Sequence, residues 1–174
     1  MLKSLVESPY STRPVIRAFS GHRPVKLDGY STTAQVTLVR FFTEYLQTIN
    51  TDVVLSGMAL GVDMAAATAA CAVGIKFIAV VPFRSQSAVW PPRDRLLYNL
   101  LLERAAETVI VCPGEYAAVK LQVRNCWMVD NATTLDYLWD GSVGGTANCV
   151  RYARQRDKLG KNLYQDWLEF KRRD

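Results

Sequence analysis

Histidine and cysteine are scarce in this chain of 174 residues. It has one histidine, His22, and no Cys-x-x-Cys pair. Zinc sites in proteins are built from clustered cysteine and histidine ligands, so we expect no metal site. The four cysteines are Cys71, Cys112, Cys126 and Cys149. We interpret them as reduced, mostly buried residues that pack like small apolar side chains.

Long apolar runs are also missing. No run approaches the roughly 20 residues that a membrane-spanning helix needs. The first ten residues, MLKSLVESPY, lack the apolar stretch and cleavage pattern of a secretion signal. We therefore expect a cytoplasmic protein with no membrane partner. Because 49% of the residues are hydrophobic and 21% are charged, the composition predicts one globular domain over residues 1–174.

Positive charge is in excess, and it is concentrated at one end. The net charge is +5, and the last 24 residues, from Arg151, hold eight Lys/Arg and four Asp/Glu. A basic segment of this kind can attract phosphates or nucleic acid. It can equally be a solvated helix face, and the sequence leaves both interpretations open.

Short apolar runs alternate with amphipathic ones along the chain, which predicts an α/β fold with a mostly parallel sheet. Predicted strands cover 15–20, 52–55, 76–82, 108–112 and 134–139, with a short last strand at 162–165. Predicted helices cover 32–49, 58–73, 93–106, 116–131 and 146–158. Parallel sheets of this class bind ligands beyond the carboxyl ends of their strands, which directs attention to the loops there.

The loop after the first strand reads SGHRP. Gly21 permits a tight turn, and His22 and Arg23 offer hydrogen-bond donors for a phosphate or a base edge. An ordinary turn with two exposed polar side chains is the alternative.

The loop after the second strand reads LSGMALGVDMAAA. Ser56, Gly57 and Gly61 allow close approach to the backbone, and a helix N-terminus that follows them would present free N–H groups. Asp63 then lies near the first helical turn, where it either caps that turn or accepts from a sugar hydroxyl.

Two later loops offer phosphate-binding groups. The third, after residue 82, holds Arg84 and Trp90, an arginine that suits phosphate and an aromatic ring that either stacks on a base or packs in the core. In the fourth, Gly144, Gly145 and Thr146 open a helix and can cradle a phosphate.

Arg124 lies in the predicted helix 116–131. It either points to a ligand or pairs structurally with an acid, and the sequence does not decide between these roles.

These segments resemble a known family. SGMALGVDMAAA, RNCWMVD and a GGT that opens a helix occur in the order found in the SLOG superfamily, which groups the bacterial DNA-processing protein A (SMF) with the Lonely Guy phosphoribohydrolases. The chain looks most like small standalone members of bacteria and phages, which also start with a GHRP-like loop. The resemblance covers about residues 19–153. It implies a Rossmann-like three-layer sandwich with a nucleotide-like ligand at the carboxyl edge of the sheet.

The resemblance also implies a site. It puts the ligand phosphate near Gly144, Gly145 and Thr146, with Ser56, Gly57 and Asp63 on the other side, and Arg124 matches the arginine beside the Lonely Guy substrate. Lonely Guy enzymes have a catalytic glutamate where this chain has Asn148. Because an amide cannot act as a base, we expect Asn148 to recognise a ligand by hydrogen bonding.

Three functions follow as hypotheses. The first is binding or sensing of a nucleotide-like small molecule, with no required cofactor. The second is hydrolysis of a nucleotide N-glycosidic bond, in which Asp63, Asp130 or Glu115 would replace the missing glutamate. The third is binding of single-stranded nucleic acid through the basic C-terminal segment. The leucine-rich helix 93–106 also permits a homodimer.

Overall fold

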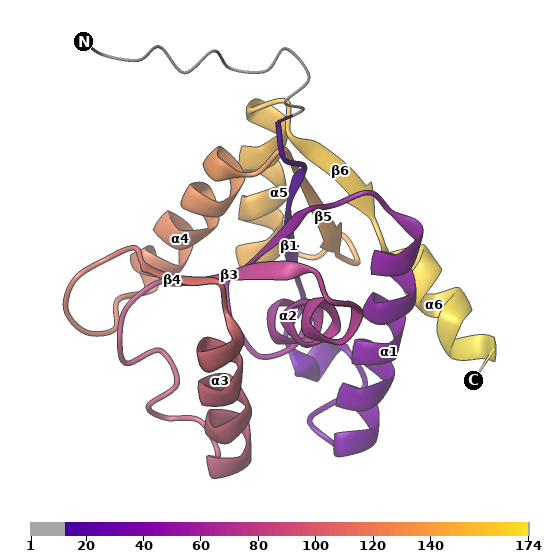
Figure 1. The fold of residues 1–174 in the computed structure, drawn as a ribbon, viewed down its shortest axis with the longest axis horizontal. Helices are drawn as coiled ribbons and strands as arrows, with labels where there is room; N and C mark the ends of the chain where they lie inside the picture. Colours follow the sequence, from indigo (N-terminus) through magenta and orange to yellow (C-terminus); the bar gives the residue numbers. More distant parts are fainter. Residues whose placement is uncertain (1–12, 174) are drawn as a thin grey trace, which may run out of the picture.

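A parallel sheet of six strands forms the centre of the computed structural model, which describes residues 13–173 (Figure 1). The strand order is β4-β3-β2-β1-β5-β6, and every neighbouring pair is parallel. The strands are β1 (Ile16–Gly21), β2 (Val53–Ser56), β3 (Lys76–Val81), β4 (Glu107–Ile110), β5 (Thr134–Leu138) and β6 (Leu159–Asn162). The predicted parallel α/β fold is confirmed.

Helices cover both faces of the sheet, which gives three layers (Figure 1). They are the 3-10 helix η1 (Pro24–Lys26), α1 (Thr32–Thr48), α2 (Val62–Val73), α3 (Pro92–Arg104), α4 (Ala118–Asn131), α5 (Gly145–Gln155) and α6 (Tyr164–Arg173). Phe19 of β1 packs in one core with residues of α1, α2, α3 and α6. Its neighbour Ala18 faces the other core, with residues of α4 and α5. Successive strand residues point to opposite faces of the sheet. Because the strands are mostly apolar, both faces present apolar side chains to the helices.

A buried polar cluster ties the central strand β1 to α1 and the edge strand β6. The Asp136 carboxylate is fully buried and accepts hydrogen bonds from Arg17 at 2.6 Å and from the Tyr45 hydroxyl at 2.7 Å. It also accepts from the Lys161 backbone N–H at 2.8 Å. These bonds fix β5 beside β1, which is the pair of strands that frames the site described below.

Two predicted elements were wrong in part. The helix expected from residue 58 begins only at Val62, because Met58 and Gly61 both have positive φ angles, of 58° and 99°, that an α-helix cannot contain. The strand expected at 162–165 is instead the end of β6 followed by α6. Asn162 ends the strand, and its side-chain oxygen accepts from the Tyr164 N–H at 3.1 Å.

The cysteines differ from the prediction as well. Only Cys149 is buried, whereas Cys71 is exposed near the end of α2 and the other two are half-buried. All four are free thiols. Among the residues that the structure describes, no helix is long and apolar enough to cross a membrane. The first ten residues, on which the prediction of no secretion signal rested, lie outside the described range.

Candidate functional site

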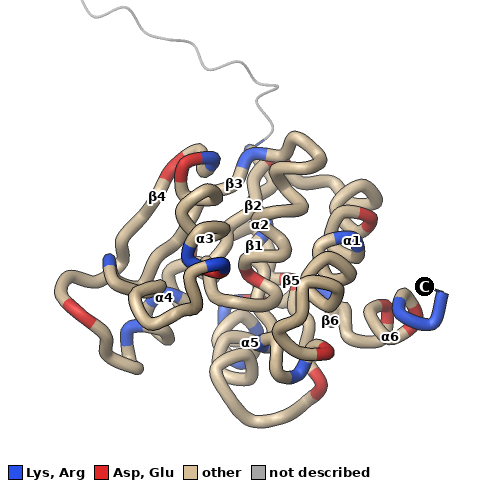
Figure 2. Tube along the Cα trace, turned by 90° about the horizontal axis from the view of Figure 1, so that it is seen from below, with Lys and Arg blue, Asp and Glu red and all other residues tan. Residues whose placement is uncertain are grey.

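The site lies where the strand order reverses. β1 sits between β2 and β5, so the connections after β1 and β5 leave the sheet in opposite directions and open a crevice at their carboxyl ends. A cavity of about 330 Å³ fills this crevice. Its walls come from the loop after β1, the start of α2, the middle of α4 and the start of α5. Figure 2 views the molecule from this side.

The N-terminus of α5 forms one wall. Gly144 is the N-cap residue, with φ of 146°, and no side chain caps the helix. Gly145 and Thr146 follow in the first turn, which holds no acidic residue. A Cβ atom at Gly145 would meet no atom within 4 Å, so the space in front of this turn is open. The first backbone N–H groups and the positive end of the helix dipole are therefore available to an anion.

Three cations line the same cavity: Arg23, Lys26 and Arg124. Arg23 is exposed, and its side chain makes no hydrogen bond or ion pair with any residue in the range 13–173. Lys26 bonds the Ser142 hydroxyl and lies 3.7 Å from an Asp140 oxygen. Arg23 is thus the cation with the greatest freedom to approach a ligand.

Arg124 is held rigidly in the floor of the cavity. Its Nη1 donates to the Gly57 carbonyl oxygen and lies 3.4 Å from Asp63 Oδ2, and its Nε donates to Asn125 Oδ1 at 2.8 Å. A Cβ atom at position 57 would overlap the guanidinium group, which explains the glycine there. Sequence reasoning had left the role of Arg124 open, and the structure shows that it pairs with an acid and also lines the cavity.

Burial affects the ionisation of this pair. It raises the pKa of Asp63, and the charge of Arg124 opposes that rise. Burial likewise lowers the pKa of Arg124, and the charge of Asp63 opposes the change. An arginine stays protonated in proteins, so the floor of the cavity carries a fixed positive charge that Asp63 balances.

His22 connects the loop after β1 to the end of β5 and the loop that follows it. Its Nε2 accepts from the Asp140 N–H at 3.0 Å, and its backbone N–H donates to the Leu138 oxygen at 3.3 Å. Burial lowers the pKa of His22, an effect that Asp140 opposes and Lys26 assists. Nε2 also lies 2.8 Å from Asp140 Oδ1, so a protonated imidazole would meet a carboxylate at this position.

Three of the predicted residues support the cavity from behind. The buried Ser56 hydroxyl donates to the Asp63 carbonyl at 2.7 Å and accepts from the Met58 N–H at 3.1 Å. Gly57 makes room for Arg124, as described above. Gly61 approaches the His22 carbonyl so closely that a Cβ atom would collide with it. These residues shape the loop before α2 without lining the cavity.

The structure brings most of the predicted residues together. Those that line the cavity are Gly21, His22, Arg23, Asp63, Arg124, Gly144, Gly145 and Thr146. Two others lie outside it: Arg84 is exposed after β3, and Asn148 is exposed on α5, where its side chain accepts from Arg151 at 3.2 Å. Sequence reasoning missed Lys26, Asn125, Leu121 and Ser142. Lys26 follows the SGHRP loop by two residues, and Asn125 adjoins Arg124. Their nearness in sequence to predicted site residues could have indicated them.

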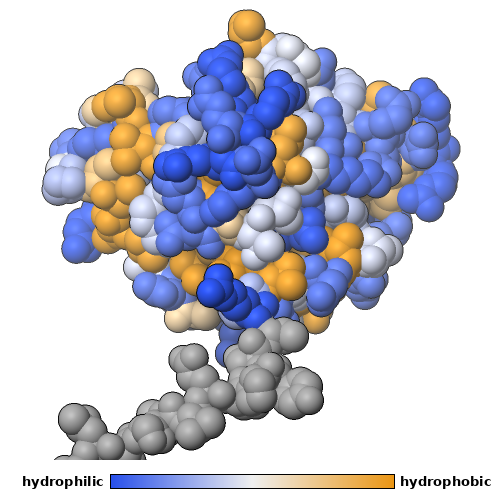
Figure 3. All heavy atoms as spheres, turned by 90° about the horizontal axis from the view of Figure 1, so that it is seen from above, coloured by the Kyte–Doolittle hydropathy of each residue, from blue (hydrophilic) through white to orange (hydrophobic). Residues whose placement is uncertain are grey.

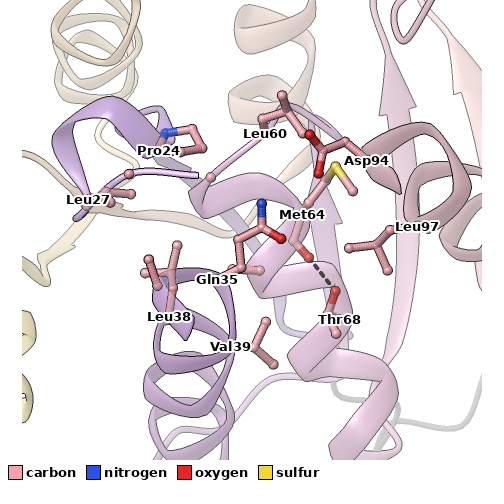
Figure 4. A pocket seen from close by; sticks show the side chains of 14 residues that line it. Pro24, Leu27, Gln35, Leu38, Val39, Leu60, Met64, Thr68, Asp94 and Leu97 are labelled. Atoms are coloured by element: carbon pink, nitrogen blue, oxygen red, sulfur yellow. Dashed lines mark hydrogen bonds between the residues drawn. The ribbon is translucent and has the colours of Figure 1, made fainter. Parts of the chain in front are cut away.

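Other features near the site are less suited to a nucleotide-like ligand. A small apolar pocket of about 40 Å³ lies between η1, α1, α2 and α3, with Leu38 and Met64 among its walls (Figure 4). It is too small for a nucleotide. Trp90, considered above as a stacking residue, is half-buried and packs edge-on against Tyr98 at 5.3 Å. In residues 13–173 no three His, Cys, Asp or Glu side chains are grouped so as to hold a metal ion.

Solved structures share this fold. DNA processing protein A from Helicobacter pylori superposes with a TM-score of 0.61 at 18% identity, over 90% of this chain and 72% of that one. The Streptococcus pneumoniae protein gives 0.60 at 19% identity, over 85% of this chain, which spans half the length of that one. The molybdenum cofactor binding protein of Rippkaea orientalis gives 0.54 at 17% identity, over 91% and 84%.

One relative is similar in sequence. The uncharacterized SPbeta prophage-derived protein YoqJ of Bacillus subtilis (strain 168) is 32% identical over 127 residues, which cover 64% of this chain and 74% of that protein. No protein-family model matches the chain. The match to YoqJ shows that the chain belongs to the family of YoqJ, and its fold is the one seen in DNA processing protein A.

Proposed function

We propose that this protein binds or senses a nucleotide or a nucleotide-derived small molecule, whose phosphate lies at the N-terminus of α5. One observation carries the proposal. An uncapped, glycine-lined helix N-terminus faces a cavity that also holds Arg23, Lys26 and Arg124. Free N–H groups, a helix dipole and nearby cations together favour an anion, and phosphate is the anion that suits such a site.

The size of the cavity supports a small molecule. Its volume of about 330 Å³ falls in the range of roughly 300–1,000 Å³ found for small-molecule pockets. Two proteins that share the fold are ligand-binding proteins. DNA processing protein A from Helicobacter pylori binds single-stranded DNA, and the Rippkaea orientalis protein binds the molybdenum cofactor. The proposal for this chain rests on its own cavity, because a fold alone does not determine function.

The positions of the carboxylates favour binding without turnover. Of the three that were considered as a replacement for the missing glutamate, Asp63 alone lines the cavity. It is engaged by Arg124 and by the Ala59 N–H at 3.4 Å. Asp130 is bonded to Tyr152 at 3.0 Å, and Glu115 is bonded to Ser85, in both cases outside the cavity.

Nucleic acid and a second copy remain further proposed partners. Basic residues close α6, and Arg151 and Arg154 are exposed on α5 (Figure 2). A nucleic-acid complex held by these residues would weaken steeply with added salt. Leu96 and Leu100 of α3 are 62% and 49% exposed, and we propose this helix as the face of a homodimer. Leu96→Glu would then convert a dimer to a monomer in size-exclusion chromatography with light scattering.

The test is a ligand screen of the wild type and three variants. Nucleoside mono-, di- and triphosphates and cyclic nucleotides are added, the melting temperature is measured, and each mixture is separated by chromatography after incubation. Gly145→Asp puts a negative charge in front of the α5 N-terminus. Gly145→Ala adds only a methyl group in open space, and Thr33→Asp adds the same charge to the first turn of α1, outside the cavity.

We expect a nucleotide to raise the melting temperature of the wild type and of Thr33→Asp, and to be recovered intact. Gly145→Asp should fold and lose the shift, while Gly145→Ala keeps most of it. Nucleotide affinity that persists in folded Gly145→Asp would refute the phosphate site. Release of free base and ribose phosphate would identify a hydrolase instead.

A further inference from the structure

A second, larger cavity adjoins the phosphate site. It has a volume of about 600 Å³ and lies beyond the carboxyl ends of β3 and β4. Two residues, Arg23 and Leu121, line both cavities, so the two spaces meet at these side chains. Arg23 and Leu121 thus lie between the phosphate site at α5 and the second cavity.

Aromatic side chains distinguish the second cavity from the first. Phe83, Trp90 and Tyr116 line it, whereas no phenylalanine, tyrosine or tryptophan within residues 13–173 lines the phosphate cavity. Phe83 is buried and meets Tyr116 edge-on, with ring centroids 5.7 Å apart. Tyr116 is 68% exposed, so its ring has free surface to offer. Every nucleobase has a flat π face, and stacking on such a ring is a common way for proteins to hold a base.

The polar groups of the second cavity point to a particular kind of base. The Gln86 amide is already used, since it donates to the Gly57 oxygen at 3.1 Å and accepts from Tyr98 at 3.3 Å. Glu115 Oε2 accepts from the Ser85 hydroxyl, while Glu115 Oε1 has no hydrogen-bond partner in the described chain. A carboxylate only accepts hydrogen bonds, so it selects a base edge with N–H donors. Among the common bases, guanine presents two such donors side by side.

We propose that the second cavity is a nucleobase subsite in which Tyr116 stacks on the base and Glu115 accepts from its N–H edge, with guanine nucleotides as the preferred ligands. Arg23, at the junction, lies against the sugar-phosphate link. The inference rests on the proposed phosphate site and adds the identity of the group attached to the phosphate. It separates a nucleotide receptor from a receptor for sugar phosphates or inorganic phosphate.

The test compares three probes that share a phosphate: GMP, IMP and ribose 5-phosphate. IMP lacks only the amino group of GMP, and ribose 5-phosphate lacks the base. Their dissociation constants are measured by titration calorimetry on the wild type, Tyr116→Ala, Glu115→Gln and Tyr30→Ala. Tyr30 is an exposed tyrosine that lines neither cavity, so its variant controls for the loss of a surface ring.

We expect the wild type to bind GMP at least tenfold more tightly than ribose 5-phosphate, and IMP in between. Tyr116→Ala should weaken GMP about tenfold and leave ribose 5-phosphate unchanged, because stacking on one ring is lost. Glu115→Gln should reduce the preference for GMP over IMP, and Tyr30→Ala should change nothing.

The two proposals fail in different ways. If no probe binds the wild type, the phosphate site itself is wrong, and the subsite falls with it. If ribose 5-phosphate binds as tightly as GMP, or if Tyr116→Ala weakens both equally, the phosphate site stands and the nucleobase subsite is refuted. If IMP binds more tightly than GMP in the wild type, the role of Glu115 is refuted.

Discussion

Arg124 and Asp63 form a buried ion pair beneath the cavity, with Nη1 3.4 Å from Oδ2 and side chains only 5% and 9% exposed. The pair joins the middle of α4 to the first turn of α2, which are elements from opposite faces of the sheet. Because both side chains are nearly buried, each depends on its partner to balance its charge. The floor of the site therefore depends on both residues.

Removal of one partner should be costly. We expect Arg124→Met to lower the free energy of unfolding by about 3–5 kcal/mol, because it leaves the buried Asp63 carboxyl without its partner. The double variant Asp63→Asn/Arg124→Met, which buries no charge, should recover part of that loss. Urea denaturation measures both. A double variant no more stable than Arg124→Met would contradict a coupled pair.

Gly57→Ala should also destabilise the protein. The new Cβ atom would overlap the Arg124 guanidinium, and we expect a loss of about 1–3 kcal/mol from overpacking. Gly145→Ala is the matched control, since its Cβ atom meets open space and alanine favours a helix. It should be as stable as the wild type in thermal denaturation. Equal melting temperatures for the two variants would show that Arg124 moves aside freely.

The stability of the protein should depend on pH through His22. Burial lowers the pKa of His22 below the 6.5 of an unfolded chain, so the folded state binds fewer protons than the unfolded state. Its contribution to stability is therefore present above pH 6.5 and is lost as the pH falls toward the folded value. His22→Gln, which keeps an acceptor for the Asp140 N–H, should show a smaller fall in melting temperature between roughly pH 8 and pH 5.

The Asp140 carboxyl does not itself titrate between roughly pH 8 and pH 5. Hydrogen bonds from Ser142 lower the pKa of the Asp140 carboxyl from 3.8, so it titrates at more acidic pH. A melting temperature of His22→Gln that falls as steeply as that of the wild type would assign the effect to other groups.

Substitutions of Thr146 and Asn148, which lie two residues apart near the start of α5, should differ in their effect on ligand binding. Thr146 lines the cavity, and Thr146→Val should weaken nucleotide affinity several-fold through the loss of a hydroxyl. Asn148 is exposed and bonded to Arg151, so Asn148→Ala should change affinity less than about twofold. Calorimetry with the same nucleotide compares them. A large loss with Asn148→Ala would restore the hydrogen-bonding role that the family pattern suggested.

Much of the fold was predictable because the strands are short apolar runs bounded by turn residues. Because these runs alternate with amphipathic segments of helical spacing, the pattern predicted helices packed on a parallel sheet. The residue pattern gave the wrong start for α2. Met58 has an apolar side chain that fits a helix, but its positive φ angle excludes it from one. The pattern failed again at α6, where the apolar residues Trp167 and Phe170 are widely spaced among charges. Both rings pack edge-on against Phe41 of α1, a contact between residues far apart in the sequence that a local pattern cannot reveal.

The site was predictable to the extent that it lies in loops after strands. The glycine-rich turns were found in this way, whereas Arg124 lies in a helix and its place beside a ligand was implied by the family resemblance. Lys26 and Ser142 were not found, because they meet across more than one hundred residues of sequence. Arg84 has the right chemistry in the right kind of loop, yet it lies outside the cavity because the ligand crevice is set by the reversal between β1 and β5.

The central position of β1 has a consequence for synthesis of the protein. β1 pairs with β2 early in the chain, but its other neighbour, β5, begins only at Thr134, and the proposed phosphate-binding turn ends at Thr146. While the ribosome is still making these later residues, the first half of the sheet has an unpaired central edge and half a binding site. A nascent or truncated chain that ends before β5 therefore exposes the β1 edge to other chains and also lacks the turn that opens α5.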